Sequence, residues 1–168
     1  LFVVVELIFF VRIQDLFPGF GLTDEHFYSP RAVNILEHGI YGTGEPPFVE
    51  KTTFRPPLYS LVLAGVYWIF DVDESLGLVL NNLLALAVGG IIFLTGAKHF
   101  SIRVGTMATA IFFFNPMLVL LANHNQSDML FTFFLACFIY SYIASLRGPA
   151  SLKHFAVASV FLLAATYT

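Results

Sequence analysis

The chain has 168 residues, of which 58% are hydrophobic and only 11% charged, with a mean hydropathy of +0.81 and a net charge of −3. Soluble domains carry about 25% charged residues, so this composition excludes an ordinary soluble domain, and without an excess of basic residues it gives no sign of nucleic-acid binding. The single cysteine, Cys137, excludes a disulfide within the chain and is interpreted as a small buried hydrophobe inside an apolar block.

Apolar residues come in long blocks, which is typical of membrane spans. The chain begins at Leu1 without methionine and ends at Thr168 inside an apolar run. We therefore expect a single membrane domain that is the N-terminal part of a longer polytopic protein. Residues 1–13 read as the end of a first span, in which Glu6 is interpreted as lying near the interface. Residues 14–75 form a polar loop.

A short helix is predicted within this loop over residues 30–38. Ser29 suits the N-cap, Pro30 the first helical position, and Gly39 the residue that ends the helix. Residues 24–28 would form a separate turn before it, or belong to one helix that is kinked at Pro30.

Residues 56–70 are apolar, but as a helix they would cover only roughly 20 Å of a hydrocarbon core about 30 Å thick. We therefore expect a juxtamembrane helix that does not cross. Trp68 suits a headgroup-level anchor. One face of this helix would carry Ser60, Ala64, Tyr67 and Asp71.

Four spans or part-spans are predicted after the loop, over residues 76–97, 104–122, 129–146 and 155–168. Pro116 would be tolerated inside the second of them. The connection before residue 104 contains Lys98 and Arg103, and the connection after residue 146 contains Arg147 and Lys153. The connection between these two spans, residues 123–127, has no Lys or Arg. By the positive-inside rule, the polar loop and residues 123–127 are then both extracytoplasmic.

Asp24 and Glu25 are the first candidates for catalysis, because adjacent carboxylates can serve as a general base and as a ligand for a cation or a sugar hydroxyl. The alternative, at better than even odds on residue type alone, is that they only complement a helix dipole. Arg55 and Lys51 could hold a lipid phosphate or merely attract headgroups. Arg31 and His26 could simply balance charge.

His124 and Asp128 are expected to face the same compartment as Asp24. Asp128 could join a shared site or bind a metal; equally, Asp128 or Ser127 could cap the following helix. The acceptor sequence for glycosylation at Asn125 is interpreted as chance, since its loop is short and close to the membrane.

The order of these features resembles the C-type membrane glycosyltransferases of the protein O-mannosyltransferase and aminoarabinose (lipid A) transferase kind. The residues that carry the resemblance are Asp24-Glu25-His26-Phe27-Tyr28 with Ala32, Glu37-His38-Gly39-Ile40-Tyr41, Arg55-Pro56-Pro57-Leu58-Tyr59, Lys98-His99-Phe100, and Asp128 before an apolar run. Ser29-Pro30 departs from the family, which usually continues one helix there.

The resemblance implies an all-α polytopic helix bundle, in a prokaryotic plasma membrane, with its active site on the extracytoplasmic face. It implies inverting transfer of a sugar from a polyprenyl-phosphate-linked donor to a glycan, lipid or protein acceptor. Asp24 would be the base and Glu25 its support. Tyr28, Arg55, Lys51, Tyr59 and Asp128 would bind substrate. Some members use a divalent metal and others none; Asp24, His124 and Asp128 are the candidate ligands.

Two other functions remain open on the sequence. A transporter or lipid flippase could use the polar loop as a gate, but such proteins place ionisable residues near the bilayer midplane. The predicted spans from residue 76 onward contain none inside their apolar parts. A non-catalytic membrane scaffold is the third candidate.

Overall fold

The computed structural model describes residues 25–44, 50–51, 55–146 and 151–168, and most of these residues are helical. Predictions for residues 1–24, including the first span, lie outside the described residues. The elements are α2 (Glu25–His38), β1 (Gly42–Thr43), β2 (Glu50–Lys51), α3 (Leu58–Phe70), α4 (Ser75–His99), α5 (Ile102–Phe113), α6 (Pro116–Ala122), α7 (Asp128–Ser145) and α8 (Ser151–Thr166). The two short strands pair antiparallel.

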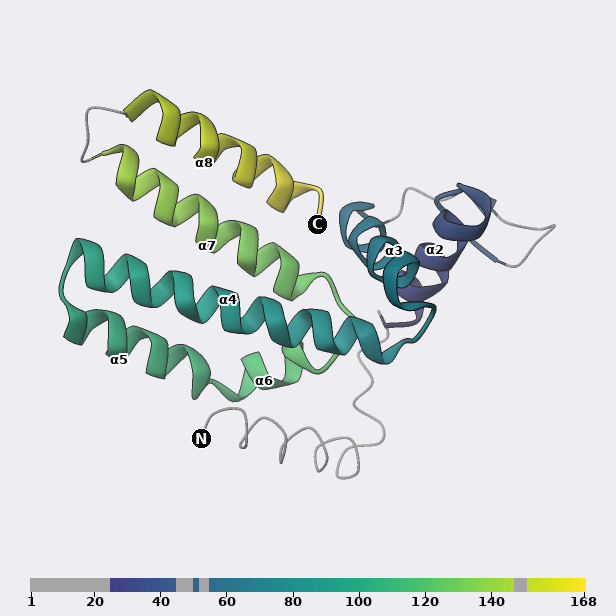
Figure 1. Cartoon of the computed structure of the whole chain (residues 1–168), viewed down its shortest axis with the longest axis horizontal. Coiled ribbons are helices and arrows are strands. Elements are labelled where there is room, and N and C mark those ends of the chain that lie inside the picture. Colours follow the sequence, from purple (N-terminus) through teal and green to yellow (C-terminus); the bar gives the residue numbers. More distant parts are fainter. Residues whose placement is uncertain (1–24, 45–49, 52–54, 147–150) are drawn as a thin grey trace.

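Helices α4, α5, α7 and α8 lie side by side in a bundle, with α7 packed between α4 and α8 (Figure 1). Helices α2 and α3 pack against each other beside one end of this bundle, where α4 and α7 begin. We call this the loop end, because residues 123–127 also lie there. The opposite end, with the turn between α4 and α5 and the start of α8, is called the turn end.

Two of the described helices are long and apolar enough to cross a membrane by length and composition. Helix α4 has 25 residues and α7 has 18, which correspond to lengths of about 37 Å and 27 Å against a hydrocarbon core of about 30 Å. They correspond to the predicted segments 76–97 and 129–146. Helix α8 covers 16 residues and begins earlier than predicted, at Ser151.

The prediction of one helix over residues 104–122 is wrong. Helix α5 ends at Phe113, and a separate helix α6 begins at Pro116. Proline has no backbone N–H to continue the hydrogen-bond ladder. Instead, the Asn115 side-chain oxygen accepts a hydrogen bond from the backbone N–H of Met117 at 3.0 Å, which starts a new helix.

The prediction that Ser29 caps a helix is also wrong. Helix α2 runs without a break through Pro30, as in the alternative of one helix that includes residues 24–28. The Ser29 hydroxyl lies 3.0 Å from the Tyr67 hydroxyl of α3 instead. Gly39, with a φ of 65°, ends the helix as predicted, and its N–H bonds the Ile35 carbonyl.

Helix α3 has 13 residues, so the prediction that this segment is a short helix is confirmed. Its buried face carries Ser60, Ala64 and Tyr67, as predicted, whereas Asp71 is exposed at the end of the helix. Trp68 is 77% exposed. The first backbone N–H of α3, from Leu58, bonds the Tyr167 carbonyl at the end of α8, so α3 is attached to the bundle as well as to α2.

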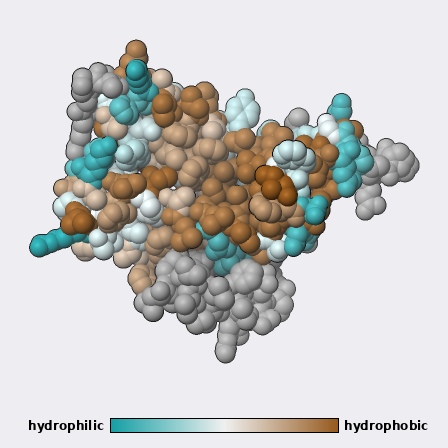
Figure 2. Space-filling model, in the orientation of Figure 1, coloured by the Kyte–Doolittle hydropathy of each residue, from teal (hydrophilic) through white to brown (hydrophobic). Residues whose placement is uncertain are grey.

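The surface of the bundle is apolar. Figure 2 shows hydrophobic residues over the middle of the visible face and hydrophilic residues mainly toward its ends. Soluble monomers rarely expose contiguous apolar patches larger than a few hundred Å². Large exposed side chains occur on every helix of the bundle, among them Leu83, Leu94, Ile111, Phe131 and Leu163. This surface fits a hydrocarbon environment.

Candidate functional site

The loop end is built on contacts between α2 and α3. The rings of Tyr28 and Tyr59 meet edge to face with centroids 5.0 Å apart. The Ser60 hydroxyl donates to the Tyr28 carbonyl at 3.5 Å. Both tyrosines are buried, at 2% and 0% exposed, in a core cluster that also includes Leu63. Helix α2 is therefore held in one position on α3.

The second loop of this end, residues 123–127, is fastened to the same assembly. The Tyr28 hydroxyl lies 3.0 Å from the Ser127 hydroxyl. The fully buried Asn81 of α4 donates from its amide nitrogen to the carbonyls of His124 and Gln126, at 2.5 and 3.1 Å. Its amide oxygen accepts from the Tyr59 hydroxyl at 3.3 Å. One side chain thus connects α3, α4 and the 123–127 loop.

Asn125 anchors the start of this loop. Its amide nitrogen donates to the Glu74 carbonyl at 2.9 Å, and the residue is only 7% exposed. A Cβ on Gly77 would collide with the Asn125 side chain, so the glycine makes room for it. Asn125 is therefore inside the fold, in agreement with the interpretation that its acceptor sequence arises by chance.

Arg31 is the largest of the fully buried side chains among the described residues, at 2% exposed. Its Nη1 donates to the Phe27 carbonyl at 2.9 Å. Its guanidinium carbon lies 5.3 Å and 5.8 Å from the ring centroids of Phe27 and Tyr41, within cation–π range. Its Nε has no hydrogen-bond partner among the described residues.

Tyr41 lies next to Arg31 and is hydrogen-bonded to the backbone of Arg55. Its hydroxyl donates to the Arg55 carbonyl at 2.7 Å. Burial raises the pKa of Tyr41, and the positive charges of Arg31 and Arg55 oppose that rise. Asn34 holds the following turn, donating to the carbonyls of Gly42 and Gly44 at 3.1 Å each. The Arg31 guanidinium and the Arg55 backbone carbonyl thus both lie next to the Tyr41 side chain.

The candidate base Asp24 lies outside the described residues, and Glu25 is the first residue of α2. The structure brings Tyr28, Tyr59 and Arg55 to one assembly; the two tyrosines are in its interior and Arg55 is half-buried. Lys51 is exposed on β2, paired across from Gly42.

Asp128 is exposed in the first turn of α7, next to the loop that carries His124. The helix-capping alternative for Ser127 does not hold, since its side chain makes no capping hydrogen bond and bonds Tyr28 instead. Within the described ranges, no three His, Cys, Asp or Glu side chains are grouped closely enough to hold a metal ion.

From the sequence, Arg31 was predicted only to balance nearby negative charge, and no role was predicted for Asn81. For Arg31 a signal was present, because Phe27 precedes it by four residues and such pairs share one helix face. For Asn81 the only signal was a polar pair, Asn81-Asn82, inside an apolar block; its partners come from distant parts of the chain.

No family model matches the chain, and comparison with the curated proteins and with the solved structures finds no match. What the chain does is therefore inferred from its own residues.

Proposed function

We propose that the chain is part of a polytopic membrane glycosyltransferase that transfers a sugar from a polyprenyl-phosphate-linked donor, with inversion, to an acceptor on the extracytoplasmic face. The bundle would span the membrane of a prokaryotic cell, with its loop end outside. The basic connections at the turn end and the absence of Lys and Arg from residues 123–127 support this orientation.

One observation carries the proposal: the Tyr28–Ser127 contact fixes α2 to the loop that leads into Asp128. Asp24 directly precedes α2 in the sequence. Helix α2, which Asp24 precedes in the sequence, and the loop before Asp128 thus meet at one end of an apolar bundle. A general base has to be held near the reacting atoms by a rigid support, and α2 on α3 is such a support.

The chemistry needs three roles. Asp24 would take the proton from an acceptor hydroxyl or amine, while the acceptor oxygen or nitrogen bonds to the anomeric carbon. The bond from that carbon to the phosphate oxygen breaks, and its electron pair leaves on the phosphate. Arg55 would stabilise the departing charge. The buried Arg31, whose guanidinium carbon lies 5.8 Å from the Tyr41 ring centroid, would add positive charge to this region without touching the phosphate.

Helix α3 would lie at the membrane surface and border the place where the carrier lipid enters. It is too short to cross, and its Trp68, Ile69 and Phe70 are each more than 60% exposed. Side chains of this kind favour the headgroup level of a bilayer, where a polyprenyl phosphate keeps its phosphate.

The test uses the full-length protein in membrane vesicles with a panel of labelled polyprenyl-phosphate sugars. Wild type should transfer sugar and Asp24→Asn should lose nearly all transfer at equal insertion. Glu50→Gln, an exposed carboxylate of the same polar loop, is the matched control and should keep wild-type rates. Equal transfer by Asp24→Asn and wild type would remove Asp24 as the base.

The alternative, a transporter or lipid flippase, is favoured by the break between α5 and α6, because transporters use discontinuous helices at substrate sites. Movement of a polyprenyl-phosphate sugar across sealed vesicles without sugar transfer would support it over glycosyl transfer.

A further inference from the structure

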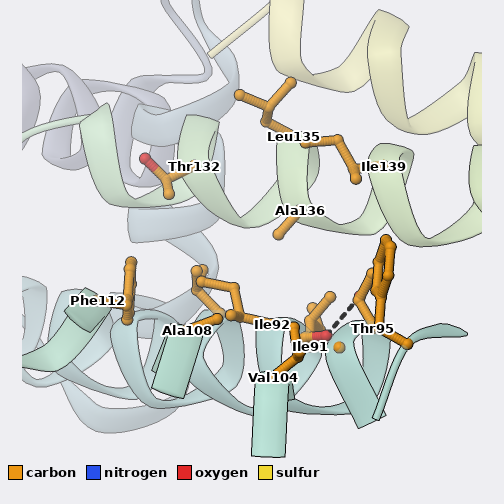
Figure 3. Close-up of a pocket in the computed structure, with 13 residues that line it drawn as sticks. Ile91, Ile92, Thr95, Val104, Ala108, Phe112, Thr132, Leu135, Ala136 and Ile139 are labelled. Atoms are coloured by element: carbon orange, nitrogen blue, oxygen red, sulfur yellow. Dashed lines mark hydrogen bonds between the residues drawn. The ribbon is translucent and has the colours of Figure 1, made fainter. Parts of the chain in front are cut away.

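A groove of about 390 Å³ lies in the bundle between α4, α5 and α7, and its volume is within the range of about 300–1,000 Å³ that is usual for ligand pockets. Figure 3 shows Leu135, Ala136 and Ile139 of α7 on one side, with residues of α4 and α5, among them Ile92 and Ala108, on the other.

The groove offers no free polar group. Thr95 and Thr132 are the hydroxyl residues of its lining. The Thr95 hydroxyl donates to the Ile91 carbonyl at 2.6 Å (Figure 3) and the Thr132 hydroxyl to the Asp128 carbonyl at 2.7 Å. Both are satisfied within their own helices, so the groove suits a hydrocarbon chain and not a sugar or an ion.

The groove reaches the turn end of the bundle, where Phe100 and Ile139 line it. A cation is placed there by a contact between helices: Lys98 Nζ donates to the Tyr140 hydroxyl at 3.2 Å and lies 5.4 Å from the centroid of that ring. Tyr140 directly follows Ile139. Lys98 is exposed, so its charge stays available at the mouth of the groove.

The charges of this end have one sign. Arg103 follows Lys98 across the α4–α5 turn, and Lys153 lies in the first turn of α8; all three are exposed. After residue 75 the sequence has a single acidic residue, Asp128, and it lies at the loop end. The mouth of an apolar groove is therefore flanked by cations, and in the described part of the bundle no carboxylate lies at this end to oppose them.

We propose that this groove binds an anionic phospholipid, with an acyl chain between α4, α5 and α7 and the headgroup phosphate at Lys98 and Arg103. An apolar chain and an anionic head match the two parts of the site. A zwitterionic lipid would lack the net charge that the basic mouth favours. A packed protein helix would leave the cations at the mouth without an anion.

This site requires the bundle to span the membrane, but it does not require sugar transfer. The donor phosphate of the proposed reaction would be held at the loop end, whereas the phospholipid headgroup lies at the turn end. Sugar transfer and lipid retention can therefore be measured in the same preparation, and failure of one leaves the other standing.

The experiment uses full-length protein purified in mild detergent and incubated with a mixture of phosphatidylglycerol and phosphatidylcholine. Native mass spectrometry then counts retained lipid. Wild type should retain one phosphatidylglycerol in preference to phosphatidylcholine. Lys98→Gln with Arg103→Gln should weaken the preference about fivefold for each charge removed. Glu37→Gln, which removes an exposed charge from α2 beside the loop end, should not change it.

A second variant keeps the charges and fills the groove. Ala136→Phe should abolish retention of the lipid while leaving the positive mouth intact. Three results would overturn the site: retention of both lipids in equal amounts, unchanged retention in Ala136→Phe, and dimerisation through the groove with no lipid retained. Removing the two charges could also invert the protein in the membrane, so protease access measures the orientation of the Lys98→Gln, Arg103→Gln variant. If that variant is inverted, the result of Ala136→Phe, which changes no charge, decides whether the groove binds lipid.

Discussion

The hydroxyl oxygens of Tyr28 and Ser127 lie 3.0 Å apart, although 99 residues separate them in the chain. This contact joins α2 to the loop before α7. Tyr28→Phe and Ser127→Ala should each lower the free energy of unfolding by about 0.5–1.5 kcal/mol, the usual net value of one hydrogen bond. Since both changes remove the same bond, the double variant should cost less than the sum. Unfolding in a denaturant series measures all three variants.

The same pair provides a functional readout. Both single variants should reduce sugar transfer, because α2 is then less firmly placed beside the second loop. Full additivity in stability together with unchanged transfer would show that the contact is incidental.

Substitution of Arg31 should lower sugar transfer without lowering stability. Arg31 forms no ion pair within the described ranges and its buried Nε has no hydrogen-bond partner there, so an apolar side chain of similar size removes the desolvation cost of a buried charge. Arg31→Met should therefore keep the melting temperature of wild type while lowering transfer about tenfold or more. Glu37→Met, which removes an exposed charge from the same helix, is the control and should keep wild-type transfer. A loss of about 3–5 kcal/mol in Arg31→Met would instead mean that a partner within the fold holds this charge.

Asn81 should be the most sensitive polar residue of the bundle. Asn81→Ala leaves the carbonyls of His124 and Gln126 and the Tyr59 hydroxyl without their present partner. Each buried group left unsatisfied costs about 1–3 kcal/mol, so a loss of several kcal/mol is expected. Thr106→Val, which removes an exposed hydroxyl bonded only within its own helix, is the control. Thermal unfolding in detergent compares the two; equal losses would contradict the role of Asn81.

Two glycines of α4 should respond in opposite ways to alanine. A Cβ at Gly96 would lie 2.5 Å from the Gly105 Cα of α5, whereas a Cβ at Gly90 meets nothing within 4 Å. Gly96→Ala should cost about 1–3 kcal/mol through overpacking. Gly90→Ala should stabilise by about 0.5–1 kcal/mol through helix propensity. The difference in melting temperature between the two variants tests the closeness of the α4–α5 contact.

Tyr41 should make stability depend on alkaline pH. Its pKa is raised by burial, against the opposing charges of Arg31 and Arg55. The protonated phenol is thus favoured in the folded state relative to the unfolded chain, where the pKa is about 10. The corresponding stability is fully present below about pH 10 and is lost as the pH rises through the higher folded value. Tyr41→Phe should remove this loss, whereas Phe at the exposed Tyr167 should not. Unfolding measured from neutral to alkaline pH checks both.

The sequence predicted the long helices well because their signal is local. The apolar run over 76–97 and the shortness of 56–70 depend on composition and length alone, and α4 and α3 follow them closely. Pro116 marked a place where a helix can be interrupted, but whether it kinks or ends there depends on Asn115, whose side chain starts the new helix.

The candidate site was harder to predict because its contacts are long-range. Ser29 has the residue type of an N-cap, yet its hydroxyl finds Tyr67 on another helix. Tyr59 was predicted to bind substrate, and its hydroxyl in the structure donates to Asn81. Burial of Arg31 arises from residues brought together by the fold. Apart from Arg31 and Phe27, which are four residues apart on α2, these pairs have no fixed spacing that a sequence pattern could register.

The contact between Gly96 and Gly105 has a consequence for how the protein would respond to its bilayer. At this point the two backbones lie so close that no side chain separates α4 from α5 and could change rotamer to let one helix turn against the other. If α4 tilts to match a thinner or thicker hydrocarbon layer, α5 tilts with it. The change in angle then falls on the residues between Phe113 and Pro116. Helix α6 would pass it directly to residues 123–127, so that membrane thickness would act on the geometry of the loop end.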